Sequence, residues 1–152
     1  MSIKIKKSLV ADKTINDDTY KEDLLIAIAL HSTDVQKGCA FIANKIIEAG
    51  ISHDYTKIPT IDEYMKERKS GIEFNAGKWY QAHINDERHH LNVRCPDDVT
   101  LIDVIEKLVD CTMAAIARKG YMTEDIISDE ILQKAYKNTV ELLKKEVILE
   151  ND

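Results

Sequence analysis

Residues 53–57 read His53-Asp54-Tyr55-Thr56-Lys57, and this stretch organises the rest of the chain. An adjacent histidine and aspartate offer an imidazole and a carboxylate one residue apart, and divalent transition metals use both as ligands. Alone, the pair is equally well explained as a helix-capping carboxylate beside an incidental histidine. The other histidines favour the metal, because all five lie between residues 31 and 90: His31, His53, His83, His89 and His90. We expect them to converge on one metal centre.

The composition bounds the class of protein. A chain of 152 residues is long enough for one domain with a substantial core. Its net charge of −6 argues against a nucleic-acid duplex as partner, which favours a basic face. The odd cysteine count (Cys39, Cys95 and Cys111), without CxxC spacing, suits reduced thiols. No segment has the roughly 20 apolar residues of a membrane span, and we expect a cytoplasmic protein.

The first helical segment runs from Thr19 to Ala49, with Gly50 as its expected end. Its apolar stripe includes Val35 and Ile47 and predicts a buried face. The Ser32-Thr33-Asp34 triplet leaves open one irregular helix or two helices. His31 lies at the end of the stripe, where a core histidine is the alternative to a metal ligand. Residues 1–18 before it are a short strand or an arm.

The segment Trp79–His90 holds three histidines within eight residues. If it is helical, His83, Asp86 and His90 share a face, whereas His89 points elsewhere unless the helix ends before it. A polar surface helix is the alternative. The spacing lacks the HExxH pattern of zincin proteases, so that reaction is set aside.

Carboxylates interrupt the most apolar helix, predicted from Val99 to about Lys119. Asp110 is surrounded by apolar residues, and a carboxylate is costly to bury there unless it is paired or binds metal. For Asp103 and Glu106 a solvated polar edge is the expectation. Before this helix, Thr60 and Glu63 predict a capping box for a short helix through Lys69. After it, Gly120 ends the helix, and a last helix without visible chemistry follows.

In this order the residues resemble the HD-type metal-dependent phosphohydrolases, an all-helical superfamily. The resemblance implies an all-α fold in which residues 19–150 form a single HD-like bundle of about five to seven helices. Lys57 matches the lysine of the family's His-Asp-x-x-Lys motif, and bacterial hydrolases of dinucleoside tetraphosphates share the layout. The implied metal ligands are His31, His53, Asp54, His83, His89, His90 and Asp110.

A closer similarity, over residues 28–115, is to a small uncharacterised family of phages and bacteria. Its members carry His-Asp-x-Ser-Lys, then Trp, a His and a His-His pair. Trp79, His83 and His89-His90 match this order, and Thr56 replaces the serine. Two departures are the short interval from His31 to His53 and Ile51-Ser52, where the HD superfamily usually has Leu-Leu.

The resemblance implies a hydrolase of a nucleotide or another small phosphoester or phosphoanhydride. One or two divalent ions (Mn, Fe, Ni, Co or Zn) would activate water, with Asp54 bridging two ions and Lys57 contacting phosphate. A phage-encoded binding protein that sequesters a nucleotide or signalling ligand is the alternative, and a purely structural metal is a third. A small phosphorylated molecule is the expected partner. The sequence leaves open whether the chain forms a homo-oligomer.

Overall fold

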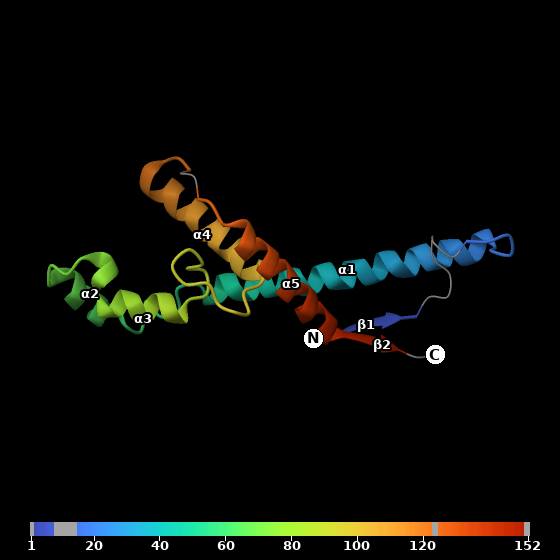
Figure 1. The fold of residues 1–152 in the computed structure, drawn as a ribbon, viewed down its shortest axis with the longest axis horizontal. Helices are drawn as coiled ribbons and strands as arrows, with labels where there is room; N and C mark the ends of the chain where they lie inside the picture. The colour runs from blue at the N-terminus through green and yellow to red at the C-terminus, as the bar shows by residue number, and fades with distance from the viewer. Residues whose placement is uncertain (1, 8–14, 123–124, 151–152) are drawn as a thin grey trace. The chain divides into compact units, whose positions relative to one another are not determined.

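The computed structural model describes residues 2–7, 15–122 and 125–150 (Figure 1). Five α-helices and one short two-stranded parallel sheet make up its regular structure, apart from a single turn of 3₁₀ helix. The predicted all-α class is therefore confirmed. Within the described ranges, no helix combines the length and the apolar content that a membrane crossing requires. All three cysteines are free thiols.

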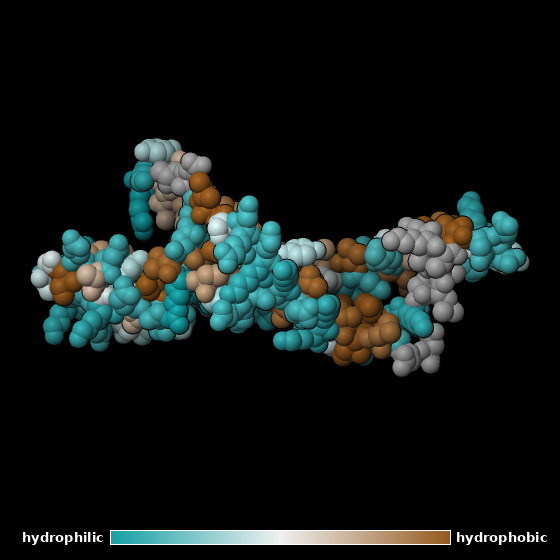
Figure 2. All heavy atoms as spheres, viewed as in Figure 1, coloured by the Kyte–Doolittle hydropathy of each residue, from teal (hydrophilic) through white to brown (hydrophobic). Residues whose placement is uncertain are grey.

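The chain divides into two units, residues 1–45 with 140–152 and residues 46–139. The first unit contains strands β1 (Ile3–Lys6) and β2 (Val147–Glu150), which pair in parallel with Ile3 opposite Val147. Residues 1 and 8–14 of the predicted N-terminal segment lie outside the described residues. Figure 2 shows apolar side chains gathered over this sheet, where Ile148 and Leu149 are exposed.

Helix α1 (Lys21–Ser52) is a single helix and does not break at Ser32. The hydroxyl of Thr33 donates to the carbonyl of Ala29 at 2.9 Å, so it follows the helix rather than capping a new one. The predicted end at Gly50 is wrong, since α1 continues to Ser52. The predicted buried stripe is also wrong in part, because Val35 and Ile47 are exposed.

The second unit carries the end of α1, helices α2 (Ile61–Lys69), α3 (Lys78–Asp86) and α4 (Leu101–Lys119), and the start of α5 (Asp129–Glu146). The one-turn helix η2 (Phe74–Ala76) precedes α3. Leu91, Val99 and Ala135 are fully or almost fully buried and form a core between the loop after α3, the start of α4 and α5. This core fixes the loop that carries two of the histidines.

The ends of these helices position the site. Helix α3 ends at Asp86 because Glu87 has an extended backbone (φ −93°, ψ 118°), so His89 and His90 lie in the following loop. Helix α4 starts with a capping box of Thr100 and Asp103 and ends at Gly120 in the left-handed conformation. The capping box predicted at Thr60 does not form. Instead, the Thr60 hydroxyl accepts a 2.7 Å hydrogen bond from Trp79 Nε1, which joins α3 to the 53–60 turn.

Candidate metal centre

The backbone at Asp54 is unusual. Asp54 has φ +57°, and it is the only non-glycine residue with positive φ in the described part of the chain. The left-handed conformation is sterically unfavourable for residues with a Cβ, although aspartate and asparagine tolerate it best. Placed two residues after the end of α1, the conformation redirects the chain at once into a tight turn, closed by Lys57 N–H donating to the Asp54 carbonyl at 2.9 Å. His53 and Asp54 can therefore face the same centre.

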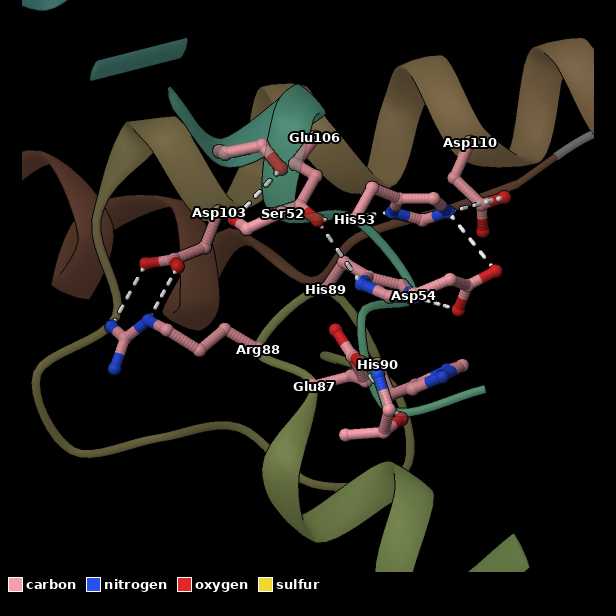
Figure 3. A network of polar contacts seen from close by, with 12 residues as sticks. Ser52, His53, Asp54, Glu87, Arg88, His89, His90, Asp103, Glu106 and Asp110 are labelled. Carbon is pink, nitrogen blue, oxygen red and sulfur yellow. Dashed lines mark hydrogen bonds and ion pairs between the residues drawn. The ribbon is translucent and has the colours of Figure 1, made fainter. Parts of the chain in front are cut away.

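Three histidine rings have their Nε2 atoms at this centre. Figure 3 shows two of them, His53 and His89, beside Asp54. Nε2 of His53 lies 3.4 Å from Asp54 Oδ2, and Nε2 of His83 lies 3.4 Å from Asp54 Oδ1. Nε2 of His89 lies 3.9 Å from the same Oδ1. Asp110, from α4, completes the group with Oδ1 at 3.4 Å from His53 Nε2. Four separate segments of the second unit thus meet at one point.

His90 extends the group on the side of α3. Its Nε2 lies 3.0 Å from Nε2 of His83, and its ring centroid lies 4.3 Å from that of His89. We call the six residues that converge here the central cluster: His53, Asp54, His83, His89, His90 and Asp110.

Glu106, which lies one helical turn before Asp110, supports two of the rings from behind. Its Oε1 accepts a hydrogen bond from His53 Nδ1 at 3.0 Å. The same oxygen lies 3.2 Å from Nδ1 of His89, close enough for an ion pair but outside hydrogen-bond geometry. Because a carboxylate only accepts, the proton of neutral His53 sits on Nδ1, and its Nε2 lone pair faces the cluster. The predicted solvated edge is therefore wrong for Glu106.

Thr56 and Glu87 fix the tautomer of His83 in the same way. The Thr56 hydroxyl donates its one proton to Glu87 Oε1 at 2.8 Å, so toward His83 Nδ1, also at 2.8 Å, it can only accept. His83 must then carry its proton on Nδ1, and its unprotonated Nε2 accepts from His90 Nε2 at 3.0 Å. Glu87 also accepts from the Thr56 backbone N–H at 3.1 Å, which ties the His-Asp turn to the end of α3.

Arg88 anchors the histidine loop to the start of α4. Its Nε and Nη2 donate to the two oxygens of Asp103 at 2.6 and 3.0 Å, a bidentate pair visible in Figure 3. Asp103 is only 4% exposed, so the predicted solvated edge is wrong here too. Because Arg88 lies between Glu87 and His89 in sequence, this pair fixes the loop on which the site depends.

The protonation states suit metal ligation. Burial, reinforced by the charges of His89 and His83, lowers the pKa of His90 to about 4. Burial also lowers the pKa of His83, helped by Lys57 and only partly opposed by Asp54. For Asp54, burial raises the pKa, but the hydrogen bond and charge of Lys57 outweigh it and leave the pKa lowered. At neutral pH, therefore, His83 and His90 are neutral and Asp54 is an anion.

Glu106 and His89 shift each other in opposite directions. Burial raises the pKa of Glu106, but the His89 and His53 rings outweigh it, so the net pKa is lowered. Burial lowers the pKa of His89, but the Glu106 carboxylate, with Asp110 and Asp54, outweighs it and leaves the pKa raised. The negative charge of Glu106 therefore favours a positive charge at the cluster, whether a proton or a cation.

The donor set fits a divalent transition metal. Ligand atoms about 2.0–2.2 Å from such an ion lie about 3.0–3.5 Å from one another, and the four closest pairs above are 3.0 to 3.4 Å apart. Asp54 Oδ1 is buried with no hydrogen-bond partner, although nitrogens surround it. Such an orphaned acceptor is costly unless a cation satisfies it. Three overlapping groups can hold an ion, namely His83-His89-His90, His53-His89-Asp110 and Asp54-His83-Glu87.

The structure brings together six of the seven predicted ligands. His31 is exposed on α1 in the first unit and belongs to none of the groups found among the described residues, so its role as a ligand stays a prediction. Lys57, predicted to contact phosphate, donates a short hydrogen bond to Asp54 Oδ2 and has a side chain 42% exposed. It therefore lies at the edge of the cluster, with access to solvent.

Nothing in the sequence singles out Thr56 as a supporting residue, and the sequence pattern alone predicts a solvated edge for Glu106. For Glu106 a signal existed, because it lies four residues before Asp110 on the same helical face. The position of Asp86 and Glu87 next to the histidines in sequence predicts that they fix histidine tautomers. Glu87 does contact Thr56 beside His83, whereas Asp86 is exposed.

No protein-family model matches this chain, and comparisons with curated proteins and with solved structures give no match either.

Proposed function

We propose that this chain is a metal-dependent phosphohydrolase of the HD type, acting on a small phosphorylated molecule such as a nucleotide. The observation that carries the proposal is the convergence of three Nε2 atoms on Asp54, whose Oδ1 is buried and has no hydrogen bond. The tautomers fixed through Glu106 and Thr56 support it, because they leave the inward nitrogens of His53 and His83 unprotonated. Such outer partners are typical of catalytic and structural metal sites alike.

The residues that would hold the metal are those of the central cluster, with Asp54 as the central carboxylate. A bound divalent ion would lower the pKa of water toward neutrality and polarise a phosphoryl oxygen. Histidine and carboxylate ligands suit Mn, Fe, Co, Ni and Zn alike. The three overlapping ligand groups support a site for two ions as well as for one.

Lys57, His90 and His89 have separate roles. Lys57 is the cation nearest the cluster and is partly solvated, so its ammonium can bind a non-bridging phosphate oxygen. His90, with a pKa near 4, is a neutral imidazole with a single ring proton at neutral pH, so it does not act as a general acid. His89, whose pKa is raised, is the ring best able to retain a proton when no cation neutralises Glu106 and Asp54.

The proposal is tested by assaying the protein, after dialysis against Mn²⁺, with a panel of phosphomonoesters, nucleotides and dinucleoside polyphosphates. We expect release of inorganic phosphate or of a nucleotide by the wild type, and loss of turnover by 10³-fold or more in His53→Ala, since both the ion and its position depend on this ring. Ligand binding with no wild-type turnover on any substrate would contradict the hydrolase and leave a sequestering protein.

A further inference from the structure

A cavity opens beside the central cluster, and metal binding does not explain it. It has a volume of about 250 Å³ and lies entirely in the second unit, between the end of α1 and one face of α4. Three of its lining residues, His53, Glu106 and Asp110, are also residues of the candidate metal centre. Anything held there would therefore lie directly against the edge of the cluster.

The rest of the lining is apolar. It consists of Ile46, Gly50, Ile105, Val109 and Met113. Val109 is 47% exposed and Met113 is 63% exposed, so these side chains form an open apolar wall rather than a sealed core. Exposed apolar side chains grouped beside polar chemistry are typical of ligand sites.

The polar groups of the cavity define what it would exclude. No lysine, arginine, serine, threonine, asparagine or glutamine lines it. Its carboxylates, Glu106 and Asp110, repel phosphate, and apart from these two and His53 the lining offers no polar side chain. The cavity is therefore suited to an uncharged apolar group, and its volume is just below the roughly 300–1,000 Å³ of sites for drug-sized ligands.

We propose that this cavity is a specificity pocket for the organic part of the substrate, and that this part is an aryl or alkyl group. This inference rests on the proposed function, since it places the phosphate at the central cluster and the apolar group beside it. It narrows the substrate to phosphoesters whose ester oxygen carries an aryl or alkyl group.

Gly50 provides a direct way to fill the pocket. A Cβ at this helical position meets no atom within 4 Å, so a larger side chain enters open space. Leucine also has a higher helix propensity than glycine, so Gly50→Leu should fold at least as well as the wild type. Gly38 is a matched control, because it lies in the same helix with equally open surroundings and lines none of the described pockets.

The test compares two phosphonates that cannot be hydrolysed, phenylphosphonate and methylphosphonate. Their affinities are measured by calorimetric titration of the Mn²⁺-loaded protein. We expect the phenyl compound to bind at least about tenfold more tightly, because its ring buries more apolar surface. Gly50→Leu should bring the two affinities to within about threefold of each other, with methylphosphonate and Mn²⁺ affinities unchanged. Gly38→Leu should retain the full preference.

Met113 supplies a readout that needs no turnover, recorded on protein loaded with diamagnetic Zn²⁺ in place of Mn²⁺. Phenylphosphonate should shift the Met113 methyl resonance, whereas methylphosphonate should not, and Met113→Ala should reduce the phenyl preference while Met122→Ala does not. Equal wild-type affinities for the two phosphonates would overturn the proposed specificity pocket. A preference for phenylphosphonate that survives Gly50→Leu would overturn it as well. Failure of the wild type to take up metal, or to bind either phosphonate once loaded, would instead overturn the proposed function.

Discussion

At the scale of single residues, the site depends on side chains that hold histidines rather than on histidines alone. Glu106 contacts His53 and His89 through a single oxygen, and Thr56 with Glu87 does the same for His83. For His53 and His83, the contact sets which ring nitrogen carries the proton. Their outward Nδ1 atoms are occupied, so their inward Nε2 atoms are available to a cation.

Replacing Glu106 tests this arrangement. We predict that Glu106→Gln lowers the affinity for Mn²⁺ about 10- to 100-fold, the range found when partners behind metal ligands are lost. The amide keeps the size of the side chain but removes the negative charge beside the two rings. Metal titration by calorimetry measures the change. Glu141→Gln is the control, because Glu141 is exposed on α5, and an equal effect in both variants would contradict the role of Glu106.

The candidate site was only partly predictable from single residues. Asp110 among apolar neighbours and the His53-Asp54 pair carried a signal, because buried acids and adjacent ligands need an explanation. Glu106 shares a helical face with Asp110, but periodicity does not say what that face meets. Only the fold shows that two histidine rings cover it.

At the scale of elements, the loop between α3 and α4 is held by Arg88 and Asp103. Asp103 accepts from Arg88 and also from the backbone N–H of Thr100 at 2.7 Å, so one buried carboxylate caps α4 and anchors the loop. The hydrogen bond of Asp103 raises the pKa of Arg88 against the opposing effect of burial, so the guanidinium stays charged.

We predict that Asp103→Ala destabilises the protein by about 3 kcal/mol, since it removes a helix cap and leaves Arg88 without its buried partner. Asp98→Ala is the matched control, because Asp98 binds the same Arg88 at 3.0 Å with a side chain 78% exposed. Exposed pairs contribute about 0–1 kcal/mol. Urea unfolding monitored by circular dichroism measures both, and equal losses would contradict the difference in burial.

Two glycines should respond in opposite directions to alanine. Gly120 ends α4 with φ +77°, where a Cβ is strained, and we expect Gly120→Ala to lower the free energy of unfolding by about 1 kcal/mol. Gly38 lies inside α1 with open space around it, and Gly38→Ala should raise the free energy by about 0.5–1 kcal/mol. Thermal unfolding of the two variants checks the signs, and a shift in the same direction would contradict the assignment of the helix end.

Helices were more predictable than their ends. Apolar periodicity located the segments that became α1, α4 and α5, because apolar spacing follows directly from the helical turn. The segment that became α2 was predicted from the Thr60 and Glu63 capping signal instead. The end of α1 was misplaced, since the left-handed residue is Asp54 and not Gly50. Thr60 was assigned to a cap, whereas it binds Trp79 and its own preceding turn, a long-range choice that local sequence does not encode.

At the scale of the whole molecule, the described metal-capable groups lie in a single unit, residues 46–139. A ligand that binds only the folded state stabilises the part that binds it. His31, the first histidine of the HD-like pattern, lies in the other unit. The HD resemblance includes His31 among the metal ligands, whereas the central cluster does not contain it. The two ligand sets can therefore be tested separately.

The HD resemblance predicts that His31→Ala lowers the amount of Mn²⁺ retained per chain, because the ring would supply a ligand. His31 is exposed on α1, so the substitution should leave the fold intact. Metal analysis after dialysis, beside the far-ultraviolet spectrum of the variant, measures both. Unchanged metal content would confine the site to the central cluster and remove His31 from the ligand set.

The central claim, that the residues around Asp54 form a metal site, is tested most directly by measuring metal content in wild type and Asp54→Asn. Asparagine keeps the shape and tolerates the φ of +57°, so the variant removes charge with little change of backbone. After dialysis against Mn²⁺ and then buffer, elemental analysis should find at least one ion per wild-type chain and a loss of most of it in Asp54→Asn. A wild type without metal, or equal content in the two proteins, would contradict the account.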